Sequence, residues 1–211
     1  MSHPVEIDPI LLSKVSKPAR YVGGEWNSVV KDHDAVKLTV AYCFPDVYEV
    51  AMSHLGLRIL YALLNERPDV AAERVYAPWP DMEEVMRSQG YPLFSLETKT
   101  PVRDFDMVGF TLQYEMSFTN ILNMLDLAGI PLFAKDRGDD MPLVAAGGPC
   151  AYSAEPLADY IDVFFPGRIG RIDAGPGRYD HRLERAGEAW RKEGPVETAL
   201  PAAGQLRAVF L

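Results

Sequence analysis

Residues 36–65, VKLTVAYCFPDVYEVAMSHLGLRILYALLN, decide the fold of this chain. An apolar run ends at Pro45, a polar cluster follows, and from about His54 the apolar residues recur at the spacing of an amphipathic helix. The cluster consists of an acid, a phenol, a second acid and an imidazole: Asp46, Tyr48, Glu49 and His54. The stretch therefore predicts a buried strand, a polar connection and a helix.

The same alternation continues along the chain. The pattern predicts strands at residues 37–43, 72–78, 104–112, 141–148 and 162–167, with shorter extended segments at 91–98 and 130–134, and several of the strands are near-continuously apolar. Amphipathic segments predict helices at 54–66, 79–90 and 117–129, and a shorter one at 155–161. Strands that alternate with helices at this spacing form right-handed βαβ units. We therefore expect an α/β domain: a doubly wound, flavodoxin-like, mainly parallel sheet with helices on both faces.

Composition divides the chain into three parts. Residues 1–35 are a polar lead-in, 36–167 carry the α/β pattern, and 168–211 form a divergent tail rich in Arg and Gly. Residues 166–211 hold 8 Lys/Arg and 6 Asp/Glu, a net charge of +2, which leaves −11 for residues 1–165. The tail offers too little apolar surface to offset the entropy of ordering it, so we expect it to be poorly packed, with at most one helix at 182–193.

The overall composition excludes several classes of protein. A net charge of −9 argues against a nucleic-acid-binding surface. No apolar stretch approaches the about 18 residues of a membrane span, and the N-terminus lacks the apolar core of a signal peptide, so we expect a cytoplasmic protein with no membrane partner. The two cysteines, Cys43 and Cys150, lie far apart, which favours reduced thiols over a disulfide or a zinc site.

Polar residues follow the expected strands at the point where each strand ends. In doubly wound sheets, ligands bind at this carboxyl edge, where the strand order reverses. We therefore expect a cofactor-binding site there, with no metal ligand and no catalytic residue assigned. Its candidate residues are Asp46, Tyr48, Glu49, His54, Gln113, Tyr114, Glu115, Gly147, Gly148 and Pro149.

Structural roles compete with this interpretation. Asp46 and Glu49 are spaced as a capping box for a helix that starts at Val47. Alternatively the helix starts near Ser53 or His54, and its dipole then favours a neutral imidazole. Gly147 and Gly148 suit either a ligand that approaches the backbone or a tight turn. The phosphate-binding GxxxxGK[ST], the hydrolase GxSxG and the zinc-binding HExxH motifs are all absent.

Several long segments resemble a known family when they are taken together. KPARYVGGEWNSVVKD, FPDVYEVAMSHLGLRILYALLN, AERVYAPWPDMEE, GFTLQYEMSFTNILNMLDLAGIPL and AAGGPCAYSAEPLADYIDVFFPG resemble, in order, the N-terminal region of bacterial radical SAM proteins with a cobalamin-binding-like domain. The match runs from about Pro18 to Gly167. The resemblance implies a flavodoxin-like domain beside a TIM-type barrel, in the same chain or a separate one, that holds a four-iron–four-sulfur cluster and S-adenosylmethionine.

The chain departs from this family at two places. The cobalamin signature D-x-H-x-x-G is missing, because Met52 stands two residues before His54 and Gly56 only two after it. Any cobalamin would then be held by its edges, without cobalt ligation by His54. The cluster motif C-x-x-x-C-x-x-C is also absent, so we expect a chain truncated before the barrel, unable to bind the cluster or S-adenosylmethionine and inactive by itself.

Two other functions remain open on the sequence. The chain could be a stand-alone module that binds a small molecule. It could also be an independent acid–base or metal-dependent enzyme, which would need its ionisable side chains close together on one edge. The residues for that chemistry are Asp46, Glu49, Glu115 and His54.

Overall fold

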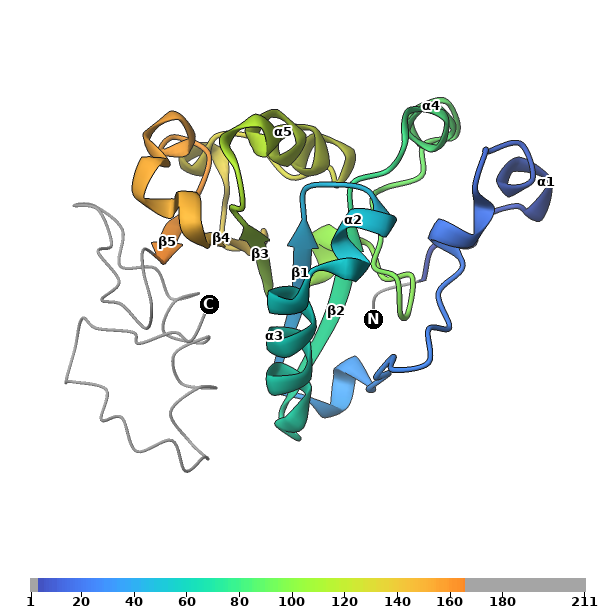
Figure 1. Cartoon of the computed structure of the whole chain (residues 1–211), viewed down its shortest axis with the longest axis horizontal. Coiled ribbons are helices and arrows are strands. Elements are labelled where there is room, and N and C mark those ends of the chain that lie inside the picture. Colours follow the sequence, from blue (N-terminus) through green and yellow to red (C-terminus); the bar gives the residue numbers. More distant parts are fainter. Residues whose placement is uncertain (1–3, 166–211) are drawn as a thin grey trace.

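A computed structural model describes residues 4–165 of the chain, and Figure 1 shows their arrangement around a central sheet. The sheet has five strands in the order β2-β1-β3-β4-β5, and every neighbouring pair is parallel. The strands are β1 (Leu38–Phe44), β2 (Val70–Tyr76), β3 (Met107–Thr111), β4 (Leu143–Gly147) and β5 (Val163–Phe165). This order confirms the predicted α/β, flavodoxin-like arrangement.

Helices cover both faces of the sheet, which explains why the strands are apolar throughout. Every residue of β1, β2, β3 and β4 is buried. On one face the strands pack against α3 (Leu55–Glu66), and on the other against α4 (Pro80–Gln89) and α5 (Phe118–Leu127). Figure 1 shows α3 on the opposite side of the sheet from α5. A sheet buried on both sides requires apolar residues at successive positions, as the sequence pattern indicated.

The remaining elements are short and lie before the sheet or between its strands. The lead-in carries α1 (Pro9–Leu12), and α2 (Tyr48–Ser53) lies between β1 and α3. The single-turn 3₁₀ helices are η1 (Pro18–Tyr21), η2 (His33–Ala35), η3 (Val102–Asp104), η4 (Glu115–Ser117), η5 (Ala134–Asp136), η6 (Pro149–Ser153) and η7 (Glu155–Leu157).

The strand order reverses beside β1. The chain passes from β1 to β2 on one side and then returns to place β3 on the other side of β1. The connections after β1 and β3 therefore leave the sheet in opposite directions. A crevice at the carboxyl ends of these two strands is the expected binding position in such a sheet.

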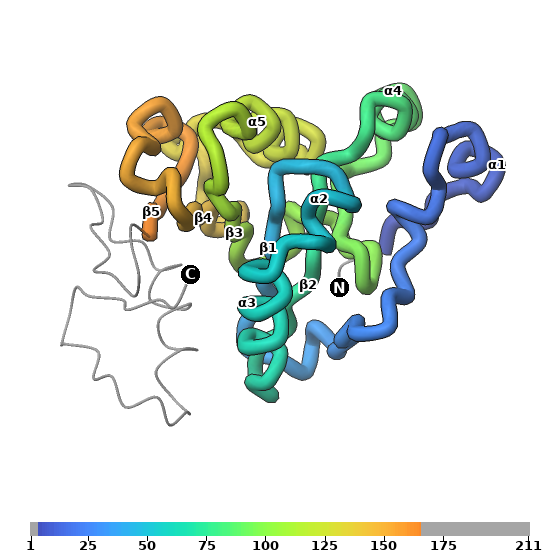
Figure 2. Tube along the Cα trace, in the orientation of Figure 1, coloured from blue at the N-terminus to red at the C-terminus, as the bar shows by residue number. Residues whose placement is uncertain are grey.

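The outer edge of β2 is covered by side chains and by a loop rather than by another strand. The Asn65 side chain bonds both the N–H and the carbonyl of Ala72, at 3.1 and 2.9 Å. Further along, the N–H of Arg74 donates to the Glu97 carboxylate at 2.8 Å, and the Arg74 carbonyl accepts from Leu96 N–H at 2.8 Å. Outside this edge the lead-in runs from α1 to the start of β1 (Figure 2).

No helix among residues 4–165 is both long and apolar enough to cross a membrane. The expectations for residues 168–211, a poorly packed tail with at most one helix, fall outside the described residues.

Candidate functional site

The loops after β1 and β3 are joined directly across the point where the strand order reverses. The Tyr114 hydroxyl donates a short hydrogen bond to the Asp46 carboxylate. Beside it, the side-chain amide of Asn120, on α5, donates to the Pro45 carbonyl at 2.9 Å. Asp46 and Tyr114 therefore meet at the carboxyl edge, as the sequence predicted, although they lie 68 residues apart.

Asp46 and Glu49 do not form the capping box that their spacing allows. The Asp46 carboxylate accepts from the adjacent Val47 N–H at 2.7 Å, and its own N–H donates to the Phe44 carbonyl. Glu49 turns instead toward the lead-in, where it pairs with Lys17 at 2.9 Å and Arg20 at 3.0 Å. Hydrogen bonds from Lys17 and Arg20 lower the pKa of Glu49 to about 2. The Glu49 carboxylate is therefore bonded to the lead-in.

Tyr48 also faces the lead-in rather than the crevice. Its ring packs edge-on against Tyr76, with the ring centres 5.7 Å apart, and burial raises the pKa of its hydroxyl. Together with Arg20, Tyr21 and Arg74 it lines a cavity of about 30 Å³. A cavity of this size has room for about one water molecule, not for a cofactor.

Helices begin close to both of the alternative starts: α2 begins at Tyr48 with Val47 as its N-cap, and α3 begins at Leu55 with His54 as its N-cap. The Nδ1 of His54 accepts the Leu57 N–H at 3.1 Å, and its ring centre lies 5.1 Å from that of Phe44. A side chain at Gly56 would meet this ring, because a Cβ there would lie 2.9 Å from His54 Cε1. Since Nδ1 already accepts a hydrogen bond, it cannot donate to a carboxylate as the D-x-H-x-x-G relay requires.

The loop after β3 contacts the loop after β4. Glu115 is exposed and accepts from the Ser153 hydroxyl at 2.9 Å. Burial, with a further effect from Glu115, raises the pKa of the Cys150 thiol. Gln113 bends back to the strand end, where its amide donates to the Thr111 hydroxyl at 2.6 Å.

Gly147 and Gly148 lie at the end of β4, where the chain passes close to the loop after β3. Gly147 is the last residue of β4, between Thr111 and Phe165 in the sheet. Gly148 has φ of +122°, and a Cβ there would lie 2.8 Å from the Leu112 carbonyl oxygen. Close approach to the backbone of the neighbouring loop therefore explains this glycine without a ligand, and the exposed Pro149 then begins η6.

The four residues proposed for acid–base chemistry are not assembled as a catalytic group. No hydrogen bond among the described residues joins any two of them, and nowhere in residues 4–165 do three His, Cys, Asp or Glu side chains form a possible metal site. Tyr114, the one phenol bound to Asp46, has its pKa raised to about 12 by that hydrogen bond. An acid or base for catalysis is most efficient with a pKa near the operating pH, so the Tyr114 hydroxyl is poorly suited to proton transfer at neutral pH.

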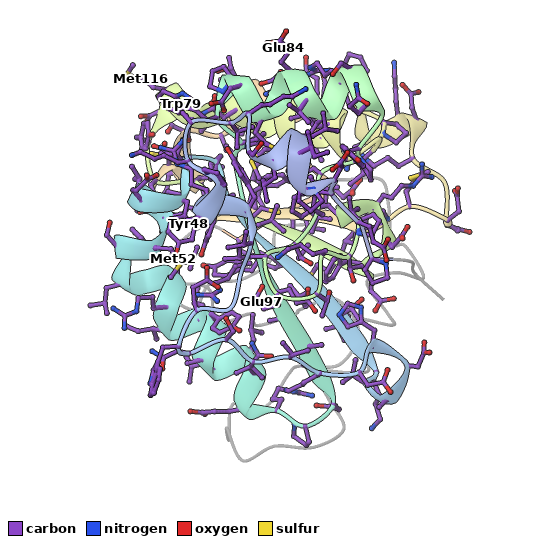
Figure 3. The ribbon with its side chains drawn as sticks, turned by 90° about the vertical axis from the view of Figure 1, so that its right-hand side faces the viewer. Tyr48, Met52, Trp79, Glu84, Glu97 and Met116 are labelled. Atoms are coloured by element: carbon purple, nitrogen blue, oxygen red, sulfur yellow. The ribbon has the colours of Figure 1, made fainter. Side chains whose placement is uncertain are left out.

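The sequence analysis assigned only Tyr114 to the site among an exposed set of large apolar side chains. They come from the segments between successive strands, and we call them the apolar rim: Val50, Leu55, Trp79, Tyr114, Met116 and Tyr152. Met116 is 87% exposed and Tyr152 is 77% exposed. In Figure 3, Met116 and Trp79 lie toward the upper left of the view with Tyr48 below them, and Figure 1 shows the helices that follow them, α5 and α4, at different positions along the sheet. Apolar residues within otherwise polar loops were the available signal.

Comparison with known proteins then identifies the family. The model for the family described as "Radical SAM proteins, N-terminal" matches residues 56–173, which is more than half of the chain. The chain belongs to this family. The matched residues include β2, β3, β4 and β5 of the sheet.

One curated relative extends the comparison. The uncharacterized protein MJ0966 of Methanocaldococcus jannaschii is 25% identical over 137 residues, covering 64% of this chain and 24% of the relative. The chain thus spans about a quarter of the length of the relative. No solved structure matches the chain.

Full-length radical SAM proteins hold an iron–sulfur cluster and S-adenosylmethionine, but the residues of this chain do not fit that cluster. A site-differentiated cluster needs three thiolates, and the sequence has two cysteines. Cys43 is buried within β1, and burial raises the pKa of its thiol, whereas Cys150 lies in η6 at the other end of the site. The cluster would have to come from another domain.

The contact between Asp46 and Tyr114 gives a direct test of the crevice. We expect the Tyr114 hydroxyl to ionise near pH 12, because its bond to the Asp46 carboxylate favours the protonated phenol. An NMR titration of ¹³C-labelled tyrosine rings measures this directly. In Asp46→Asn the midpoint should fall toward about 10, the ordinary tyrosine value. An unchanged midpoint in that variant would show that the loops after β1 and β3 do not meet.

Proposed function

We propose that this chain is the accessory N-terminal domain of a radical SAM protein, and that its carboxyl edge receives the radical SAM domain in the same polypeptide or in a separate one. The apolar rim carries this proposal. Family membership supports a radical SAM domain as the partner, and the exposed side chains of the rim support a protein contact at this edge.

The composition of the rim supports a protein contact. Aromatic residues and methionine are enriched in protein interfaces. The rim has three aromatic side chains and a methionine: Trp79, Tyr114, Tyr152 and Met116. The Asp46–Tyr114 and Glu115–Ser153 hydrogen bonds join the loops after β1, β3 and β4, and the Ala77 N–H, just after β2, donates to the Asp46 carbonyl at 3.0 Å. A surface held in this way loses little conformational freedom on binding.

The side chains present indicate what the partner and this chain would each contribute. The partner would supply the cluster and S-adenosylmethionine, which together generate the radical in this family. This chain would cover one side of that site and exclude water from it. In this proposal the domain is not catalytic by itself.

Cobalamin is a second candidate for the same edge. A flat macrocycle could lie against the aromatic side chains of the rim at the point where the strand order reverses. His54 caps α3 through Nδ1 and lacks the relay for cobalt ligation. Titration with hydroxocobalamin should therefore give the same cobalt spectrum for the wild type and for His54→Ala. A spectrum that changes in the variant would assign His54 as a ligand after all.

Site-specific photocrosslinking in cells tests the proposed partner. A benzophenone amino acid replaces Met116 in one variant and, as a matched control, Val30 in another, because Val30 is 66% exposed and lies on the lead-in. We expect the Met116 probe to crosslink to a peptide from a domain that contains C-x-x-x-C-x-x-C, and the Val30 probe not to do so. Adducts at Met116 that lack this motif, or equal adducts from both positions, would contradict the proposal.

A further inference from the structure

The second half of the lead-in is attached to the domain by side chains. We call residues 22–35 the strap; it passes along the outer edge of β2 and the end of α3 (Figure 2). Among the described residues, the backbone hydrogen bonds of the strap are local turns, such as Ser28 N–H to the Glu25 carbonyl and Ala35 N–H to the Asp32 carbonyl. The strap is therefore held in a different way from a strand.

Two anchors fix the middle of the strap. Arg74, buried in β2, donates through Nη2 to the Ser28 hydroxyl at 2.9 Å and lies 3.5 Å from the Glu25 carboxylate. The next anchor is the Tyr61 hydroxyl on α3, which accepts the Val29 N–H at 2.7 Å.

Two further anchors fix its end, and both depend on a proton. Lys31 Nζ donates to the carbonyls of Asn65, Arg67 and Val70 at 2.9, 2.6 and 2.6 Å, where α3 ends. His33 Nε2 lies 2.7 Å from Glu73 Oε1. Rising pH weakens both contacts, because a neutral amine has fewer N–H donors and a neutral imidazole forms a weaker hydrogen bond to a carboxylate.

The Glu73 carboxylate takes one of its hydrogen bonds from the strap. This side chain is 1% exposed in β2, and its Oε2 accepts from the Thr98 hydroxyl at 2.7 Å. Its Oε1 is bonded by His33. If the strap leaves, one oxygen of a buried carboxylate loses its donor, which carries a substantial free-energy cost. The His33–Glu73 contact is therefore strong while both groups are charged.

We propose that the strap is a pH-sensitive clasp, fastened while His33 is protonated and loosened when His33 loses its proton. The groups that face His33 are consistent with this. They are Glu73 in β2, Asp106 just before β3 and Asp32 in the strap, and the Phe105 ring lies edge-on with centres 5.3 Å apart. Three carboxylates around one imidazole favour its charged form.

The other charged groups near His33 and Lys31 do not reverse the direction in which pH changes these contacts. Glu97 and Lys99 approach Glu73 from the segment after α4 and carry opposite charges. Asp69 approaches Lys31 and favours the charged amine, against burial, which lowers the pKa of Lys31.

The shifted pKa values of His33 and Glu73 set the pH range over which the strap is held. The hydrogen bond to Glu73 raises the pKa of His33 above its ordinary value, against the effect of burial. Burial alone would raise the pKa of Glu73, but hydrogen bonds from His33, Ser95 and Thr98 outweigh it and lower that pKa. The contribution of His33 is thus full below about 6.5 and is lost as pH rises through its raised pKa. Glu73 contributes above about 4.3 and loses its effect as pH falls through its lowered pKa.

Release of the strap would also affect the carboxyl edge of the sheet, through Arg74. Arg74, which holds Glu25 and Ser28, lies 3.4 Å through Nη1 from the Met52 sulfur on α2, and α2 directly follows the loop of Asp46. A loosened strap leaves Arg74 with fewer partners and gives α2 more freedom.

Hydrogen exchange on the full chain tests the clasp, with rates expressed as protection factors so that the intrinsic effect of pH is removed. We expect protection of the Val29 amide to fall between about pH 6 and about pH 9, about tenfold for each unit by which the pKa of His33 is raised. The Val144 amide, which donates to Asp162 in the sheet, is the internal reference and should not change.

Two variants identify the group responsible. In His33→Gln the Val29 protection should be low and nearly independent of pH over this range. Asp34→Asn, in the same 3₁₀ helix but exposed, should keep the wild-type response. The proposal is overturned if wild-type protection is flat, if His33→Gln keeps the fall, or if the His33 ring titrates by NMR at or below its ordinary value.

Discussion

Replacement of Arg74 by Met should lower the free energy of unfolding by about 3–5 kcal/mol, because it leaves buried carboxylates without their cation. The Arg74 side chain is 5% exposed and Glu97 is fully buried, with 2.6 Å between Arg74 Nε and Glu97 Oε1. Denaturant unfolding followed by circular dichroism measures the loss as a shift of the midpoint at unchanged slope.

A second substitution separates the lost pair from lost packing. In Arg74→Met with Glu97→Met the fully buried charge of Glu97 is removed together with its partner, and only the partly exposed Glu25 loses its cation, so most of the stability should return. Burial also raises the pKa of Glu97. Without Arg74 that pKa should rise further, so Arg74→Met should be more stable at lower pH and lose stability as pH rises through it. A double variant as unstable as the single one would show that the aliphatic part of Arg74 was responsible.

Gly148→Ala should destabilise the domain by about 3 kcal/mol or more. The conformation at φ of +122° disfavours any residue with a Cβ, at about 1–3 kcal/mol. The new methyl group would also lie 2.8 Å from the carbonyl oxygen and 3.0 Å from the nitrogen of Leu112, and neither backbone atom can move easily. Thermal unfolding should therefore begin at a clearly lower temperature.

Gly90→Ala is the matched control for this prediction. Gly90 ends α4 with φ of +73° and has no atom within 4 Å of the position of a Cβ. It tests the backbone effect without the collision, and the expected loss is about 1 kcal/mol. Equal losses in the two variants would contradict the close approach of the loops after β3 and β4.

The sequence predicted the sheet because its signal is local. An apolar run that ends at a proline and a polar cluster, as at Pro45, indicates a buried strand without knowledge of distant residues. The start of α3 at His54 was predicted for the same reason, since an N-cap contacts only the next turn. Asp46 and Tyr114 were placed together by the rule for parallel strands, which needs only the strand ends.

The local sequence pattern could not predict side-chain directions or contacts between segments that are distant in the sequence. Glu49 was assigned to the crevice, but its partners Lys17 and Arg20 lie in the lead-in, about thirty residues away. The dipeptide Glu73–Arg74 gave no sign of burial, because charged residues in an edge strand are usually exposed. Each becomes buried only when segments distant in sequence supply Glu97, His33 and Thr98.

The covered edge of β2 limits how this sheet can be extended. Open strand edges are where other chains pair, in aggregation or in recognition of an extended peptide. At β2 the amide of Asn65 and the residues around Glu97 already occupy the hydrogen-bonding groups of Ala72 and Arg74. A sixth strand, whatever its origin, could pair beside β2 only by displacing these side chains. The edge nearest the lead-in is thus closed to extension by contacts within the described residues.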